Sequence, residues 1–327
     1  MEPGVRPNGA NDQSATAVSA IPPVSLNDYD ADFVGFSRRL GQSFERFGFA
    51  VVADHGLPAG LVDGCLDRAK AFFALPEAVK RRYHVVGGGG QRGYTPFGIE
   101  TAKGAQLRDL KEFWHVGREL PPGHRYDGLI APNIWPGEID GFREFADGLY
   151  AGLDALGLRM LRAIAHHLGL TDEFFTPTVQ DSDSILRLLH YPPLPAGAEG
   201  LRAAPHEDIN AITLLLGAEE AGLEILDRDG RWLAVNPPPG SVVVNVGDML
   251  QRLTNDRLPS TTHRVANPAA ARAGAARYST PFFLHFAPDY RIETLGQCIG
   301  VDRPNRYPEA ITSRDFLLER LREIKLV

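Results

Sequence analysis

Two histidines and one aspartate, His206, Asp208 and His263, have the residue types and spacing of a metal site. The first two lie in the segment PHEDIN, and the third lies in STTHRV, 55 residues after Asp208. Residues i and i+2 of a β-strand face the same side, so His206 and Asp208 can share a cavity while Glu207 points away. Two imidazoles and one carboxylate leave three positions of an octahedron open, which suits an Fe(II) ion that must bind a cosubstrate and O2.

Other interpretations of these three residues stay open at this point. A His-x-Asp pattern often arises by chance, and a histidine in a β-strand can simply be a hydrogen-bonded core residue. The same three ligands could also hold Zn²⁺ and polarise a water molecule for hydrolysis.

A second pattern, Arg277-Tyr278-Ser279, follows His263 by 14 residues and opens a predicted strand. Arg277 and Ser279 would face the same side of that strand. The planar guanidinium matches a carboxylate, and the serine hydroxyl adds a donor. A buried arginine needs an anionic partner, which a dicarboxylate that chelates the metal at its other end would supply. Tyr191 could add a further hydroxyl, and a structural Asp or Glu beside Arg277 is the alternative.

These candidate residues lie in a region of short apolar or alternating runs between Ser184 and Phe286. The runs are SILRLLHY, AITLLL, LEIL, RWLAV, SVVVNV, THRVAN and RYSTPFFLHF. Seven runs separated by Gly, Pro, Asn and Asp predict an all-β sandwich or barrel rather than a parallel sheet. About four strands fit between Asp208 and His263, enough for the chain to cross the sandwich and return.

Helical patterns flank this β region. Apolar residues at helical spacing predict an amphipathic helix over residues 33–47, and FAVVA at residues 49–53 predicts a buried strand. Residues 24–26 predict a short strand, residues 61–73 and 141–169 predict further helices, and residues 313–325 predict a helix capped by Ser313. The four glycines at residues 87–90 begin a loop that is expected to continue from Gln91 to Gly104.

Composition limits the classes of protein that the chain can belong to. It has 327 residues, 43% hydrophobic, a net charge of -7 and no prominent Lys/Arg run, so we expect no nucleic-acid or anionic-membrane partner. No apolar run is long enough to span a membrane. Only Cys65 and Cys298 are present, which argues against a disulfide framework and favours the cytoplasm.

The chain is expected to form one packed unit behind a short tail. Residues 1–20 lack the apolar region of a secretory signal and predict a disordered tail. Residues 21–135 predict a mixed α/β region, and residues 136–327 a helical segment followed by the β core that carries the site.

Most of the chain resembles the 2-oxoglutarate- and Fe(II)-dependent dioxygenases, in the branch that looks like isopenicillin N synthase. The segments that carry the resemblance are IPPVSL, FERFGFAVVADHGLP, RGYTPFG, DLKEFWHVG, LRLLHYPP, PHEDINAITLLL, VVVNVGDMLQRLTNDRLPSTTHRV and RYSTPFFLHF. They occur in the order and at the spacing found in the family. The resemblance implies a mainly β fold with flanking helices and a distorted double-stranded β-helix, or jelly-roll, core.

The resemblance also implies a role for each matching residue. His206, Asp208 and His263 would bind iron, and Arg277 and Ser279 would hold the distal carboxylate of 2-oxoglutarate. Tyr191 takes the place of a tyrosine that contacts the same cosubstrate. Many plant relatives have an asparagine two residues before that tyrosine, where this chain has Leu189. Contact with the keto-acid end is therefore expected to differ and to involve Arg187, whose side chain should face the same way.

The reaction implied by the family consumes 2-oxoglutarate and O2, releases succinate and CO2, and hydroxylates, desaturates or cyclises a small-molecule substrate. Two alternatives are an isopenicillin N synthase-type oxidase that does not use 2-oxoglutarate and a catalytically silent jelly-roll protein that binds a small acid. Succinate release would distinguish the first alternative, and a broken metal triad would mark the second. Four aromatic residues suggest a partly aromatic pocket near His285; they are Tyr94, Phe97, Phe283 and Phe286. Neither the substrate nor the oligomeric state follows from the sequence.

Overall fold

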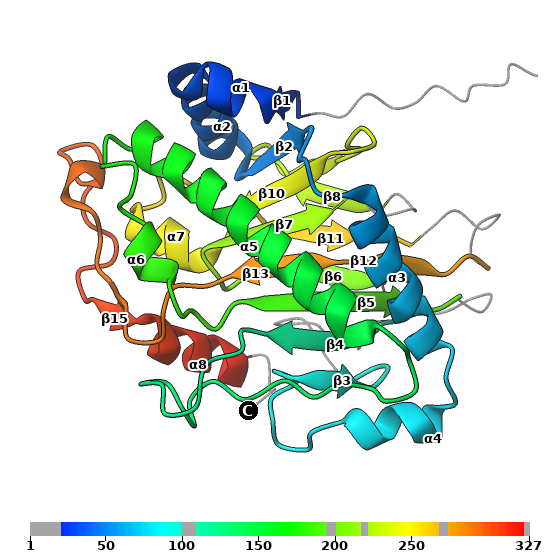
Figure 1. The fold of residues 1–327 in the computed structure, drawn as a ribbon. Helices are drawn as coiled ribbons and strands as arrows, with labels where there is room; N and C mark the ends of the chain where they lie inside the picture. Colours follow the sequence, from blue (N-terminus) through cyan, green and yellow to red (C-terminus); the bar gives the residue numbers. More distant parts are fainter. Residues whose placement is uncertain (1–20, 100–108, 194–200, 217–221, 268–273, 324–327) are drawn as a thin grey trace, which may run out of the picture.

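Two facing β-sheets form the centre of the molecule, and helices cover the outer face of the larger sheet in this computed structural model (Figure 1). The structure describes residues 21–99, 109–193, 201–216, 222–267 and 274–323. The predicted tail at residues 1–20 and the end of the predicted loop, residues 100–104, lie outside this part of the chain.

The larger sheet has the strand order β1-β2-β10-β7-β13-β5-β4-β3, and β12 also pairs with β5. Its strands are β1 (Pro23–Ser25), β2 (Phe49–Ala53), β3 (Gly93–Thr95), β4 (Glu112–Gly117), β5 (Ile185–Tyr191), β7 (Ile212–Leu216), β10 (Val242–Val246), β12 (Arg277–Ser279) and β13 (Pro281–Leu284). The smaller sheet, in the order β6-β11-β8-β9, contains β6 (Ala203–His206), β8 (Leu223–Leu226), β9 (Trp232–Ala234) and β11 (His263–Val265). A separate pair is formed by β14 (Arg291–Ile292) and β15 (Ile311–Thr312).

The helices are α1 (Asn27–Ala31), α2 (Phe33–Phe47), α3 (Ala59–Phe73), α4 (Glu77–Lys80), α5 (Phe142–His167), α6 (Thr176–Val179), α7 (Asp248–Leu253) and α8 (Ser313–Glu323). The long helix α5 crosses the larger sheet and packs against α2 and α3 (Figure 1). Among the described residues, no helix has both the length and the apolar character needed to cross a bilayer.

Strand β10 has side chains in two hydrophobic cores, because alternate residues of a strand face opposite sides of the sheet. Val242, Val244 and Val246 pack into the large core beneath the helices. Val243 faces the other way and packs with Ile225 of β8 between the two sheets. A strand buried on both faces reads as a continuous apolar run, which is why this segment is so rich in valine.

The predicted mainly β fold with flanking helices is confirmed, and so are several predicted elements. Helix α2 and strand β2 have the predicted bounds, and α5 differs from its prediction by one or two residues at each end. Residues 91–104 were expected to be a loop, which is wrong for Gly93–Thr95, because these residues pair with β4. The cap of α8 is also different: Thr312, not Ser313, accepts the backbone N–H of Asp315 on its Oγ1 at 3.1 Å.

A buried ionic network lies on the helix-facing side of β4. Glu112 accepts hydrogen bonds from Lys80 Nζ at 2.7 Å, from His190 Nδ1 at 2.7 Å and from the Tyr94 hydroxyl. Burial alone would raise the pKa of Glu112, but His190, Lys80 and Tyr94 together hold it below its ordinary value of 4.5. The network therefore stabilises the ionised carboxylate in the folded protein.

Replacing Glu112 with leucine should lower the free energy of unfolding by about 3 kcal/mol, because the Lys80 ammonium stays buried after losing its main partner. Urea unfolding at neutral pH measures this loss. The double variant Glu112→Leu/Lys80→Met should recover part of it. Since the pKa is lowered in the folded state, this stability is present above pH 4.5 and is lost as the pH falls through the lower folded value. A loss below 0.5 kcal/mol, roughly that of an ordinary surface change, would contradict the expectation.

Candidate metal and cosubstrate site

Strand pairing brings His206, Asp208 and His263 together. His206 ends β6 and pairs directly with His263, which begins β11, so the two rings lie 4.4 Å apart. Asp208 lies two residues after the end of β6, with its Oδ1 3.9 Å from His206 Nε2 and 3.8 Å from His263 Nε2. The expectation that one strand would hold both His206 and Asp208 is therefore wrong, because β6 ends at His206. In the described part of the interval before His263 lie four strands, β7 to β10, as predicted.

The hydrogen bonds of both histidines leave the same nitrogen directed at the aspartate. His206 Nδ1 lies 2.7 Å from the carbonyl of Ala204, and His263 Nδ1 lies 3.1 Å from the carbonyl of Thr261. Each Nδ1 must donate to its carbonyl, so each neutral ring keeps a lone pair on Nε2. Burial, followed by repulsion from His263, lowers the pKa of His206 and favours this neutral form.

Asp208 is oriented by two side chains from the larger sheet. Its Oδ2 accepts the Thr213 hydroxyl of β7 at 2.5 Å and the Asn245 amide of β10 at 2.8 Å. Burial opposes ionisation, but both histidines and these two hydrogen bonds hold the pKa of Asp208 below its ordinary value. Oδ1 is left facing the imidazoles, and these three residues could together hold a metal ion. Two neutral nitrogens and one carboxylate oxygen form a donor set that suits Fe(II).

Thr213→Val should weaken Fe(II) binding by roughly 10-fold or more, because the groups that orient a metal-binding carboxylate contribute strongly to affinity. The substitution keeps the shape of the side chain and removes only the hydroxyl that holds Asp208. Competition with a chromophoric chelator under anaerobic conditions measures the change. Thr178→Val is the matched control. The Thr178 hydroxyl is also buried, but it donates to the backbone carbonyl of Phe175, the residue before α6, and not to a triad residue. Equal iron affinity in the two variants would contradict the role given to Thr213.

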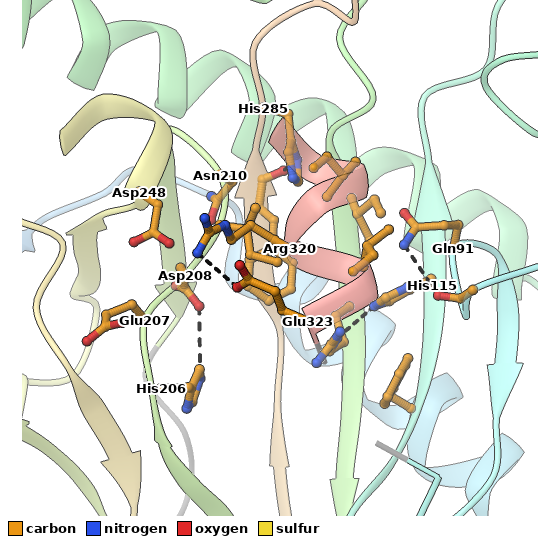
Figure 2. Close-up of a pocket in the computed structure, with 18 of the residues that line it drawn as sticks. Gln91, His115, His206, Glu207, Asp208, Asn210, Asp248, His285, Arg320 and Glu323 are labelled. Carbon is orange, nitrogen blue, oxygen red and sulfur yellow. Dashed lines mark hydrogen bonds and ion pairs between the residues drawn. The ribbon is translucent and has the colours of Figure 1, made fainter. Parts of the chain in front are cut away.

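A cavity of about 360 Å³ opens beside His206 and Asp208. Figure 2 shows Glu207 and Asp248 on one side, Gln91 and His115 on the other, and Arg320 and Glu323 of α8 between them. Arg320 and Glu323 form an ion pair of 2.9 Å. Burial, with a contribution from Glu207, raises the pKa of Asp248 to about 6. We call this space the outer chamber.

A smaller cavity of about 70 Å³, here called the inner chamber, lies behind the triad between the two sheets. Arg277, Ser279 and Tyr191 line it, and all three side chains are buried. The register pairs Arg277 with Tyr191 and Ser279 with Leu189, so the side chains of β12 and β5 share one face. Arg277 Nη1 donates to Ser279 Oγ at 3.3 Å, and the guanidinium lies 5.2 Å from the centre of the Tyr191 ring.

Arg187 lines both chambers, on the same face of β5 as Leu189 and Tyr191. Its guanidinium carbon lies 4.0 Å from the centre of the Phe113 ring and 5.1 Å from that of Phe283. Its Nε donates to His115 Nε2 at 2.6 Å. The aromatic rings and the imidazole therefore fix the position of this cation.

The predicted pocket wall is correct in part. Phe283 and His285 line the outer chamber. The hydroxyl of Tyr94 instead bonds to Glu112 on the opposite side of the sheet, and Phe286 stacks on Phe175 in the core. Phe97 is 45% exposed and does not line either chamber. The outer chamber is therefore less aromatic than expected, and several charged side chains line it.

Several residues of the chambers were not found from the sequence. Lys111, Phe113 and His115 lie at every second position along β4 and the residue before it, and all three line the outer chamber. DLKEFWHVG has no clear apolar alternation, so its resemblance to a segment of the dioxygenase family was the signal that could have indicated this strand. Arg320 of α8 also lines the outer chamber, but nothing in the sequence of this C-terminal helix indicates that its side chain reaches the site.

Comparison with known proteins gives matches along most of the chain. Residues 21–138 match a family described as non-haem dioxygenase in morphine synthesis N-terminal, and residues 182–286 match the 2OG-Fe(II) oxygenase superfamily. A proline hydroxylase from Petromyces alliaceus is 34% identical over 313 residues, which cover 90% of this chain and 95% of that protein.

Solved structures agree with these matches. A 2OG-Fe(II) oxygenase family protein from Caulobacter crescentus is 59% identical and has a TM-score of 0.88, covering 94% of this chain and 99% of that one. A Neurospora crassa protein, solved in complex with α-ketoglutarate (another name for 2-oxoglutarate), is 29% identical and has a TM-score of 0.82. The match covers 92% of this chain and 95% of that one. The same Neurospora protein is known with α-ketoglutarate and thymine bound.

Proposed function

The chain belongs to the 2-oxoglutarate- and Fe(II)-dependent oxygenase superfamily, and from that premise we propose a role for each residue of the two chambers. The enzyme is a 2-oxoglutarate-dependent non-haem iron dioxygenase. In the proposal, His206, Asp208 and His263 are its iron ligands, the inner chamber binds 2-oxoglutarate, and the outer chamber binds the substrate.

The observation that carries the proposal is the position of the triad between the two chambers. Nε2 of both histidines and Oδ1 of Asp208 converge on one point, and residues of the triad line each chamber. A cosubstrate and a substrate can therefore reach the same metal from different sides. Fe(II) bound there would supply the chemistry that couples O2 reduction to the oxidation of 2-oxoglutarate to succinate and CO2.

In the inner chamber, Arg277 and Ser279 would bind the distal carboxylate of 2-oxoglutarate. The guanidinium offers a planar pair of donors, and the serine hydroxyl lies beside it at 3.3 Å. The Tyr191 hydroxyl would contact the same cosubstrate. Burial raises the pKa of Tyr191, so the phenol stays protonated and can donate a hydrogen bond.

In the outer chamber, Arg187 and His115 would orient a small polar substrate, and Arg187, which also lines the inner chamber, would contact the keto-acid end of 2-oxoglutarate. Their mutual hydrogen bond and the two phenylalanine rings restrict both side chains before a ligand arrives, which reduces the entropy lost on binding. The Petromyces relative is named a proline hydroxylase, and the Neurospora protein binds thymine. Both are small polar molecules, and a chamber of about 360 Å³ suits a substrate of that size.

The test is a screen of small polar metabolites for substrate-dependent succinate release by the Fe(II)-loaded enzyme. We expect at least one compound to increase succinate formation and to be recovered with a changed mass. Product formation without succinate would instead support the oxidase that does not use 2-oxoglutarate. The mass change distinguishes the reaction type, because hydroxylation adds an oxygen atom whereas desaturation and ring closure remove two hydrogen atoms.

A further inference from the structure

A second buried cation, Lys111, lies beside the proposed iron and cosubstrate sites. It immediately precedes β4, and its side chain is only 6% exposed. It lines both the inner and the outer chamber, as do His206 and Asp208. A buried ammonium is costly unless anionic groups surround it, so this position calls for an explanation.

Lys111 is held by a neighbouring aspartate that is itself anchored. Lys111 Nζ lies 2.8 Å from Asp109 Oδ2, and Asp109 is also buried. The other oxygen of Asp109 accepts the backbone N–H of Ala204 at 3.0 Å. Ala204 is in β6, two residues before His206, so the pair connects β4 to the strand that carries a proposed iron ligand.

The sheet register places Lys111 next to Tyr191. Glu112 pairs with His190 in the β4–β5 ladder, so continuing this register by one residue sets Lys111 opposite Tyr191, and both line the inner chamber. Burial and repulsion from His263 lower the pKa of His206, and the Lys111 ammonium adds to this effect. Burial raises the pKa of Tyr191, and Arg277 and Lys111 oppose that rise. Lys111 therefore lies between a proposed ligand of the metal and a proposed contact of the cosubstrate.

We propose that Lys111 binds 2-oxoglutarate, alongside the dianion between its metal-bound end and the carboxylate held by Arg277, and that Asp109 positions the ammonium. The inference rests on the proposed function, because it takes the inner chamber as the cosubstrate site. A dianion that extends from the metal to Arg277 passes a residue that lies beside both His206 and Tyr191. Leu189 stands where many plant relatives have an asparagine, and Lys111, just before β4, adds a polar contact to the one expected from Arg187.

The test compares Lys111→Met with Lys80→Met. Both lysines are buried and paired with a carboxylate at 2.8 and 2.7 Å, but Lys80 lies on the helix-facing side of β4. Anaerobic titration of the Fe(II)-loaded protein with 2-oxoglutarate, followed by the metal-to-ligand absorption of the chelate, gives Kd for each variant. We expect Lys111→Met to raise Kd by roughly 10- to 100-fold, as for the loss of a charge-assisted hydrogen bond. Lys80→Met should change it less than about 2-fold, and both should bind Fe(II) normally.

A second variant, Lys111→Met/Asp109→Asn, removes the carboxylate that the single change leaves buried and keeps an oxygen for the Ala204 N–H. It should show the same rise in Kd with better stability. If both Lys111 variants bind 2-oxoglutarate normally while Arg277→Ala does not, the pair is a structural ion pair and the inference is overturned. If Arg277→Ala also binds normally, the assignment of the inner chamber fails instead.

Discussion

Alanine in place of either His206 or Asp208 is expected to abolish Fe(II) binding and turnover together. Both side chains present one donor atom to the same point, and Asp208 supplies the only negative charge of the triad. Removing one of three protein ligands leaves too few contacts to hold a labile divalent ion. The wild-type protein should bind one Fe(II) per chain, since His206, Asp208 and His263 could together hold one ion.

Iron content after anaerobic reconstitution and desalting, measured together with succinate release, tests this expectation. His166→Ala is a matched control, because His166 also lies near a carboxylate, Asp172 at 3.0 Å, but is on the end of α5. That variant should keep full iron content and activity. Tight iron binding that survives either His206→Ala or Asp208→Ala would rule out the assignment of the ligands.

The second large effect concerns Arg277. Arg277→Ala should leave iron binding intact and weaken 2-oxoglutarate binding, because the distal carboxylate loses its charged partner in a buried chamber. Loss of a buried charge-assisted pair costs roughly 2–5 kcal/mol. At about 1.4 kcal/mol for each factor of ten, Kd should rise by roughly 30-fold or more.

Two further variants separate charge from geometry at this position. Arg277→Lys should recover only part of the affinity, because an ammonium cannot reproduce the planar pair of donors. Ser279→Ala should cost about 1 kcal/mol, as expected for one hydroxyl contact. Anaerobic titration of the Fe(II)-loaded variants measures all three values. An unchanged affinity in Arg277→Ala would remove the cosubstrate role and reassign the arginine to a substrate carboxylate.

The sequence was most informative where potential metal ligands or carboxylate-binding residues lie two positions apart in one short segment. The sequence predicted His206, Asp208 and His263 as a metal site, and the structure brings their ligand atoms together. Arg277 and Ser279 were correctly expected to share a face. The prediction that Asp208 lies in the same strand as His206 was wrong, because the i, i+2 spacing of the two residues does not reveal where the strand ends. The Asp208 carboxylate is instead held by Thr213 of β7 and by Asn245 of β10, 37 residues further along the chain.

The walls of the chambers were harder to predict because their residues meet only through tertiary packing. An aromatic residue near a site can point to either side of the sheet, as Tyr94 and Phe283 demonstrate by facing opposite sides. Strand β4 was not predicted because its two buried faces mix Glu112, Trp114 and His115 without a clear apolar period. Arg320 reaches the outer chamber only because α8 folds back over it (Figure 2).

The two faces of β4 have a consequence for how this enzyme can diversify. Lys111, Phe113 and His115 face the chambers, while Glu112 and Trp114 face the helices. Inserting or deleting one residue in this strand would exchange the two sets, placing an ionic network in the chamber and chamber residues in the core. Length variation should therefore be strongly selected against in β4 and tolerated in loops. Libraries intended to change substrate preference should vary alternate positions of this strand and keep its length constant.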